Sequence, residues 1–231
     1  MANFTGKGIS AFSLKMIMAA LMVMDHLAYF LPDIFPFWFR YIGRMVAPVF
    51  CYLMTVSLRH TRDRGKYIIR LATAGLVMFA GNLILMYTLR GPNIFNNIFL
   101  SLAVGAALIV SVEQVAQRKE NRPLHIIAIA VLCAVSFFVE GSLLLPVMAL
   151  IFYFLRGNKP VMFLAYLLAG TSVVLVAGMR DYQLLQAFAI IPIALYSGKK
   201  GGGAAFSKWF FYLFYPLHIW ILYIVQQVIF I

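Results

Sequence analysis

The sequence predicts an all-α protein that crosses a membrane several times. Hydrophobic residues make up 64% of its 231 residues, charged residues only 11%, and the mean hydropathy is +0.92. Soluble domains carry about a quarter charged residues, so this composition excludes that class. Long apolar runs recur along the chain, and their lengths suit membrane helices of roughly 20 residues rather than the shorter alternating strands of a barrel. We therefore expect a polytopic integral membrane helical bundle that forms a single domain over residues 1–231.

Nine apolar segments are expected to form transmembrane helices, and most of their ends are marked by charged residues, prolines or glycines. In chain order they are Ala11–Leu31, Phe37–Leu58, Tyr67–Leu89, Phe95–Gln117, Leu124–Val139, Leu143–Leu155, Val161–Gly178, Leu184–Ser197 and Lys208–Phe230. The first segment is too long for a signal peptide and lacks a small-residue cleavage site, so it is expected to be a retained helix. The sixth and eighth segments are short, which leaves counts of seven or eight open.

The basic residues predict how the helices are oriented, because short cytoplasmic loops carry an excess of lysine and arginine. With nine spans and the N-terminus inside, fifteen of the 19 basic residues fall on the inner side. They are Lys7, Lys15, Arg59, Arg62, Arg64, Lys66, Arg70, Arg118, Lys119, Arg122, Arg156, Lys159, Lys199, Lys200 and Lys208. Only Arg40, Arg44, Arg90 and Arg180 remain for the outer side. The sequence therefore predicts an N-in, C-out topology.

The same asymmetry accounts for the formal net charge of +12 without a nucleic-acid partner. We expect membrane lipid and no nucleic acid among the partners. Cys51 and Cys133 both fall within apolar segments, where each is expected to pack as a small apolar residue. The sequence contains no His-Glu-x-x-His or paired Cys-x-x-Cys motif, and no metal is expected.

One loop stands apart in composition, the basic glycine-rich stretch from Ser197 to Ala204. Consecutive backbone amides beside lysines can bind phosphate oxygens. The stretch lacks the residue order of a Walker loop, so a flexible cytoplasmic hinge is the favoured interpretation and a phosphate site the alternative.

Asp25 and His26 lie side by side within the first apolar segment. Ionisable groups at membrane depth are costly and usually functional. A rise of about 1.5 Å per residue places His26 roughly 8 Å, and Arg44 of the next segment about 10 Å, below the outer boundary. Neighbouring residues on a helix point about 100° apart, so Asp25 and His26 are expected to face different partners. We expect Asp25 to pair with Arg44 or to orient a group in the cavity, and His26 to line the cavity as a proton-transfer group.

Three further polar groups are expected in the outer half of the bundle. Asn97 lies at the outer start of the fourth segment, Glu140 follows the fifth, and His218 lies near Pro216 in the last, where the proline permits a kink. For each of them, a hydrogen bond that ties helices together is the structural alternative.

The order of these motifs resembles the TraX family, the pilin N-acetylases of conjugative plasmids. The resemblance rests on Leu21-Met-Val-Met-Asp-His26 followed by Ile42-Gly-Arg-Met-Val-Ala-Pro-Val-Phe50, and it covers nearly the whole chain. The segments at Asn97, Glu140-Gly141 and Tyr215-Pro-Leu-His218 follow in the family's order. The Glu140-Gly141 turn departs from the family's pattern, which argues against a catalytic part for Glu140.

The resemblance implies an acyltransferase of the bacterial inner membrane that uses acetyl-CoA to acetylate the N-terminal amine of processed pilin or of another exported acceptor. We expect His26, Asp25, Arg44, Asn97 and His218 to be catalytic. His26 would deprotonate the amine, Arg44 with Asn97 would stabilise the oxyanion, and an acetyl-histidine relay is the variant. The phosphates of acetyl-CoA are assigned to Arg59, Arg62, Arg64, Lys66, Arg70, Lys199 and Lys200. A proton-coupled transporter and a non-catalytic pilin assembly factor remain as alternatives.

Overall fold

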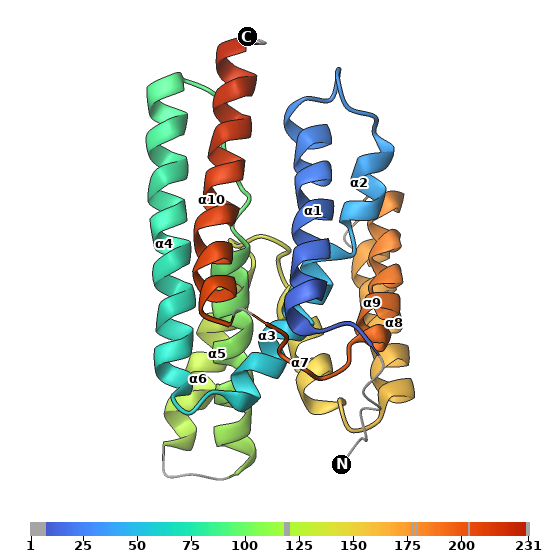
Figure 1. Ribbon diagram of the computed structural model, residues 1–231. Coiled ribbons are helices and arrows are strands. Elements are labelled where there is room, and N and C mark those ends of the chain that lie inside the picture. The colour runs from blue at the N-terminus through green and yellow to red at the C-terminus, as the bar shows by residue number, and fades with distance from the viewer. Residues whose placement is uncertain (1–7, 118–120, 177, 179, 203, 230–231) are drawn as a thin grey trace. The chain divides into compact units, whose positions relative to one another are not determined.

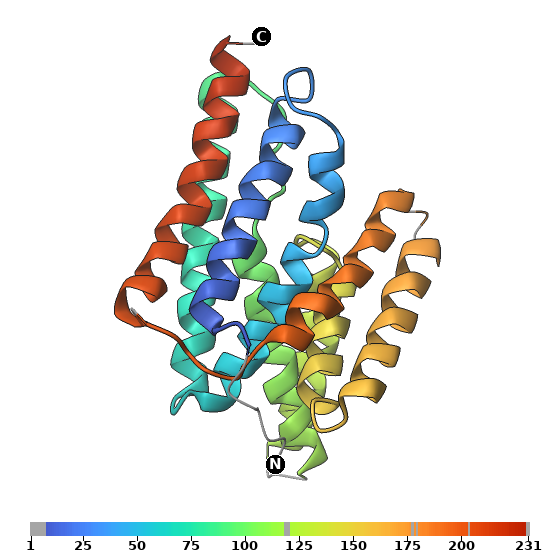
Figure 2. The same ribbon diagram turned by 45° about the vertical axis from the view of Figure 1, so that its right-hand side comes forward.

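A computed structural model describes residues 8–117, 121–176, 178, 180–202 and 204–229. The described residues form helices and one isolated β-bridge but no strand, which confirms the all-α class (Figures 1 and 2). The helices are α1 (Ala11–Phe30), α2 (Trp38–Gly43), α3 (Val46–His60), α4 (Arg64–Leu89), α5 (Ile98–Ala116), α6 (Arg122–Ser136), α7 (Leu144–Phe154), α8 (Lys159–Val176), the 3-10 helix η1 (Asp181–Ala189), α9 (Ile190–Leu195) and α10 (Ala204–Ile229). Lys7, Arg118 and Lys119 of the predicted inner side lie outside the described residues, as do Gly203 and the side chain of Lys208.

All nine expected segments correspond to helical segments of the described chain. Six are long and apolar enough to cross a membrane: α1, α2 with α3, α4, α5, α8 and Trp209–Val228 of α10. The other three, α6, α7 and η1 with α9, are apolar but shorter. The protein is therefore a multi-pass membrane protein, and its N-in, C-out orientation stays a prediction.

Local sequence signals explain where several helices begin. The Ser10 hydroxyl accepts a hydrogen bond from the backbone N–H of Ser13 at 3.1 Å and caps α1. The Asn97 side chain caps α5 by accepting from the N–H of Leu100 at 3.4 Å. Pro123 lies in the first turn of α6, where its missing N–H removes no helical hydrogen bond.

The second expected segment is interrupted between α2 and α3, and Pro48 supplies the physical reason. A proline ring clashes with the carbonyl four residues earlier, which here belongs to Arg44. Gly43 is accordingly the last residue of α2, and α3 begins at Val46, so that Pro48 lies in its first turn. This break places Arg44 at a turn between two helices.

The chain divides into two compact units, each built from separate stretches of sequence. The first contains Met1–Phe50, Met78–Ile94 and Val174–Ile231, and the second contains Cys51–Val77 and Phe95–Val173. The single domain expected from the sequence stays a prediction.

In the first unit, α1 packs against α2 and α10, and η1 contacts α2 and α9. Leu14, Met18 and Met22 recur every fourth residue on the buried face of α1. Helix α10 is tied to α4 by the Trp220 indole N–H, which donates to Asn82 Oδ1 at 2.9 Å.

In the second unit, α5 packs against α6 and α7. Helix α5 buries Leu102, Ala106 and Ile109, and Gly105 lets α7 approach so closely that an added Cβ would lie 3.2 Å from that of Ala149. Small residues at such contacts are typical of membrane helices.

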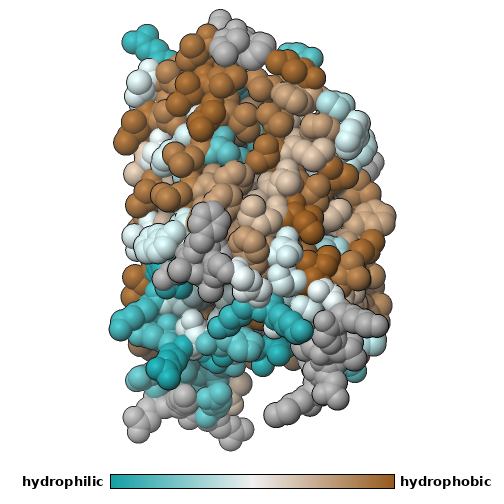
Figure 3. All heavy atoms as spheres, in the orientation of Figure 1, coloured by the Kyte–Doolittle hydropathy of each residue, from teal (hydrophilic) through white to brown (hydrophobic). Residues whose placement is uncertain are grey.

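Figure 3 shows hydrophobic side chains in brown over much of the visible surface, as expected where helices face lipid.

Candidate functional site

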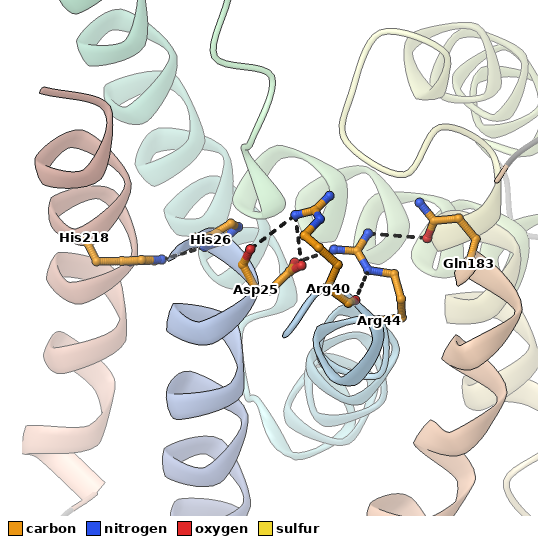
Figure 4. A network of polar contacts seen from close by, with 6 residues as sticks. All are labelled: Asp25, His26, Arg40, Arg44, Gln183 and His218. Atoms are coloured by element: carbon orange, nitrogen blue, oxygen red, sulfur yellow. Dashed lines mark hydrogen bonds and ion pairs between the residues drawn. The ribbon is translucent and has the colours of Figure 1, made fainter. Parts of the chain in front are cut away.

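Six polar residues of the first unit form a connected cluster, which we call the Asp25 cluster (Figure 4). They come from α1, α2 and the turn after it, η1 and α10: Asp25, His26, Arg40, Arg44, Gln183 and His218. Asp25 and His26 are adjacent in sequence but turn to different partners, as their positions on a helix require.

His26 faces His218 on α10. His26 Nδ1 lies 2.9 Å from His218 Nε2, and the two side chains belong to residues only 4% and 9% exposed. His218 Nδ1 in turn lies 2.8 Å from the carbonyl oxygen of Phe214, one helical turn earlier. Two imidazoles in direct hydrogen-bond contact inside an apolar bundle form a site that can accept and return a proton.

Asp25 faces two arginines. Arg40 Nη1 lies 2.9 Å from Asp25 Oδ1, and Arg44 Nη2 forms an ion pair and hydrogen bond with Asp25 Oδ2. Arg40 and Arg44 are four residues apart, so both reach the same side of α2. Since one carboxylate balances two guanidinium groups, these three side chains carry one net positive charge.

Further contacts hold the two guanidinium groups in place. Arg44 Nε donates to the carbonyl oxygen of Arg40 at 3.1 Å, and Arg44 Nη1 donates to Gln183 Oε1 at 3.4 Å. The Arg40 guanidinium lies 4.8 Å from the Tyr29 ring centre, and that of Arg44 lies 5.5 Å from the Tyr182 ring centre. These cation–π contacts fix the positive groups on one side of Asp25.

Gly43 and Pro48 explain why the backbone delivers Arg44 to Asp25. A Cβ on Gly43 would lie 2.5 Å from Asp25 Cγ and 3.0 Å from Asp25 Oδ1, so only glycine permits this approach of α2 to α1. Pro48 ends the helix near Arg44 and turns the chain there. The Gly-Arg and Pro-x-Phe motif found in the sequence therefore builds one half of the Asp25 cluster.

The sequence located part of this cluster. The expected pairing of Asp25 with Arg44 is present, and His218 lies beside His26. Arg40 was assigned only to the outer side, although its spacing of four residues from Arg44 is a signal that could have found it. Gln183 was missed, and no local pattern singles it out.

Asn97 and Glu140 lie together in the second unit. The Asn97 backbone N–H donates to Glu140 Oε2 at 2.6 Å, and Asn97 Nδ2 donates to the carbonyl oxygen of Gly75 at 2.8 Å. Ser101 Oγ donates to the Glu140 carbonyl oxygen at 2.6 Å. These bonds tie α4, α5 and the segment after α6 together, and the catalytic part expected for Asn97 stays a prediction.

The expected phosphate-binding residues of the second unit are largely engaged by neighbours. Arg59 donates to the Tyr153 carbonyl oxygen with its guanidinium carbon 4.0 Å from the Tyr153 ring centre, and Arg64 pairs with Glu113. Lys66 Nζ lies 3.4 Å from Asp63 Oδ2. The Lys66 backbone N–H donates to Asp63 Oδ1 and holds the pKa of Asp63 below its usual range. The Arg70 guanidinium lies 5.3 Å from the Tyr67 ring centre, and Arg62 is exposed.

The glycine-rich loop of the first unit is anchored to the start of α1. The carbonyl oxygens of Lys199 and Lys200 accept hydrogen bonds from the N–H groups of Ala11 and Phe12 at 2.9 and 3.1 Å. The N–H of Ile9 donates to the Leu195 carbonyl oxygen at 2.9 Å. Both lysines are exposed. The loop is therefore bound through its carbonyl groups to α1, the helix that carries Asp25 and His26.

Comparisons with known proteins agree with the resemblance noted in the sequence. The family model described as "TraX protein" matches residues 10–226. The probable fimbrial assembly protein FimC, serogroup H1, of Dichelobacter nodosus is 28% identical over 233 residues, which cover 91% of this chain and 93% of that protein. No solved structure matches the chain.

Proposed function

Because the chain belongs to the TraX family, we propose that it is a membrane-embedded acetyltransferase that moves an acetyl group from acetyl-CoA to the N-terminal amine of processed pilin. The similarity to a fimbrial assembly protein supports the link to pilus subunits. The bacterial inner membrane is the proposed location, because acetyl-CoA is cytosolic and an exported subunit is reached from the other side.

The observation that carries this proposal is the buried contact between His26 and His218 beside Asp25 and its two arginines. An amine arrives as an ammonium group and must lose a proton before its nitrogen attacks a thioester. His26 is the proposed general base. It is an imidazole held at membrane depth, where a proton acceptor suited to neutral pH is needed.

The net positive charge of the Asp25–Arg40–Arg44 group suits the second requirement of acyl transfer. Attack on the thioester carbonyl forms a tetrahedral intermediate with a negatively charged oxygen. Arg44, with Arg40 beside it, is proposed to stabilise this oxyanion, since a fixed positive group away from water acts strongly there. Asp25 holds both guanidinium groups in position.

The donor would be held through the negative charge of its phosphates. Arg59, Arg62, Arg64, Lys66, Arg70, Lys199 and Lys200 are the proposed contacts for its phosphates. Lys199 and Lys200 adjoin the first residues of α1, and Ala11 and His26 are separated by about 22 Å of helix at 1.5 Å per residue. An extended phosphopantetheine arm has a comparable length, so a donor held by these lysines could present its thioester near His26.

The test is thiol release from acetyl-CoA by the purified full chain, with and without a pilin-like peptide that has a free N-terminus. The matched variants are His26→Ala and His60→Ala, since His60 is an exposed histidine on α3. We expect amine-dependent release by wild type and His60→Ala, and a loss of at least about 100-fold in His26→Ala, as for removal of a general base. If acetylated protein could be trapped in the absence of peptide, the mechanism would proceed through an acetyl-histidine intermediate.

A non-catalytic assembly factor is the second candidate, favoured by the name of the fimbrial relative. It predicts peptide binding that His26→Ala leaves intact and no thiol release by any form of the protein. A proton-coupled transporter, which the paired histidines would also suit, predicts proton flux in vesicles that His26→Ala abolishes, again without thiol release.

A further inference from the structure

The hydrogen bonds of His218 fix which of its nitrogens carries a proton. His218 Nδ1 lies 2.8 Å from the Phe214 carbonyl oxygen, and a carbonyl oxygen can only accept a hydrogen bond. Nδ1 must therefore be protonated. The His218 ring also stacks on the Phe214 ring, with centres 5.0 Å apart and planes inclined by 17°, which holds the imidazole in this orientation.

The proton on His218 Nδ1 determines which nitrogen of His26 carries a proton. A neutral imidazole has one N–H, so His218 Nε2 carries a lone pair and acts as an acceptor. Its partner at 2.9 Å is His26 Nδ1, which must then be the donor. The lone pair of neutral His26 is thereby placed on Nε2, on the other side of the ring from His218.

Rotating either ring by 180° does not offer an equivalent arrangement. Rotation of His26 would put a carbon atom in place of Nδ1 against His218 Nε2. Rotation of His218 would remove both of its hydrogen bonds at once. Each lost bond leaves a buried polar group unpaired, at about 1–3 kcal/mol.

We propose that His218 is a positioning residue that holds neutral His26 in the Nδ1–H form and so makes His26 Nε2 the proton-accepting atom of the site. Free histidine in water favours the opposite, Nε2–H form, in which Nε2 cannot accept a proton. The importance of Nε2 for acetyl transfer rests on the proposed function. Which nitrogen of each neutral ring carries the proton does not depend on that function.

The proton positions can be measured directly on the full chain in lipid nanodiscs with nitrogen-15-labelled histidine. Protonated and unprotonated ring nitrogens have well-separated chemical shifts, and the signals of His26 are identified by their loss in His26→Gln. His60 serves as an internal reference, because its Nδ1 lies 2.8 Å from the Val56 carbonyl oxygen and does not depend on His218. The spectra are recorded at a pH high enough for both imidazole rings to be neutral, so that each ring carries a single N–H.

We expect both His26 and His218 to carry their proton on Nδ1 in the wild type. In His218→Ala, His26 should change to mainly Nε2–H, and kcat should fall at least about tenfold with little change in KM for acetyl-CoA, because the acceptor atom is lost and the donor site is not. In His218→Gln, the amide oxygen can accept from His26 Nδ1, so this variant should retain the Nδ1–H form and recover part of kcat.

A wild-type His26 protonated on Nε2 would overturn the proposal, and so would a His218→Ala variant in which His26 keeps its proton on Nδ1. If His218→Ala does not fold, His218→Gln and the wild-type spectrum still decide the matter. Expected spectra together with no thiol release by the wild type would leave the role of His218 intact and count against the acetyltransferase. The two proposals therefore fail in distinguishable ways.

Discussion

Gly43 controls the geometry around Asp25 although it carries no polar side chain. An added Cβ would lie 2.5 Å from Asp25 Cγ, well inside contact distance, so Gly43→Ala must displace the carboxylate or push α2 away from α1. Overpacking of this kind costs about 1–3 kcal/mol. We expect Gly43→Ala to lower thermal stability, measured on the detergent-solubilised protein, and to reduce acetyl transfer more than about tenfold, since small displacements of reacting groups have large kinetic effects.

Gly157→Ala is the matched control, because a Cβ there meets no atom within 4 Å. It should leave both stability and activity close to wild type. Wild-type behaviour of Gly43→Ala would contradict the close approach of α2 to Asp25, and equal losses in both variants would point to a general effect of the alanine.

At the scale of single residues, the sequence predicted contacts between consecutive helices better than contacts between residues far apart in the chain. Asp25 and Arg44 could be matched because their depths follow from the rise of two consecutive helices. The second partner of Asp25, Arg40, and the hydrogen bond of Arg44 to Gln183 depend on how α2 is rotated and on where η1 docks. Helix periodicity does not determine either property.

At the scale of elements, all nine expected segments were found, because apolar length is the strongest signal in a membrane protein. The break between α2 and α3 was missed, since a proline in the first turn of a helix is compatible with an uninterrupted apolar run. The eighth segment combines η1 with α9 and is short, as expected. Hydropathy thus predicted where these elements lie but did not predict the turns within them, such as the one between α2 and α3.

The glycine-rich loop was expected to be a flexible hinge, yet its carbonyl groups cap the start of α1. This contact requires Gly201, which has a φ of 81° and where a Cβ would lie 2.5 Å from Ser10 Oγ. We expect Gly201→Ala to weaken the junction and to increase amide hydrogen exchange at Ala11 and Phe12, because their acceptors move.

Gly202→Ala provides the control for this prediction, since a Cβ at the neighbouring position meets nothing within 4 Å. Exchange at the start of α1 should remain as in the wild type. If the two alanine variants behaved alike, the loop would not be anchored in the way described, and a hinge would again be the better interpretation.

At the scale of the whole molecule, a composition of 64% hydrophobic and 11% charged residues predicted a membrane protein, and the lengths of its apolar runs predicted helices. Composition could not predict that the first unit assembles from three separate stretches of chain. The contact of His26 with His218 joins residues 192 positions apart and depends on that assembly. A single sequence holds no local signal for such a pair.

The orientation of the chain in the membrane is the prediction on which the proposed chemistry depends most. Acetyl-CoA can reach the basic residues from the cytosol only if the turn between α3 and α4 and the glycine-rich loop face inward. Labelling with a membrane-impermeant maleimide tests this in spheroplasts, in a protein whose two cysteines are first replaced by Cys51→Ala and Cys133→Ala. Single cysteines are then introduced at four exposed positions: Asp33→Cys, Arg90→Cys, Arg62→Cys and Lys200→Cys.

We expect Asp33→Cys and Arg90→Cys to react in intact spheroplasts, and Arg62→Cys and Lys200→Cys to react only after lysis. The charge distribution predicts this pattern, because fifteen of the 19 basic residues fall on one side when nine segments alternate across the membrane. If the pattern were reversed, the phosphate-binding residues would face away from the cytosol and the proposed donor site would be wrong. A third outcome is that Lys200→Cys reacts in intact spheroplasts while the other three positions behave as expected. An odd number of the three short segments between α5 and α10 would then fail to cross the membrane. In that case Lys199 and Lys200 could not bind the donor, whereas Arg62 still could.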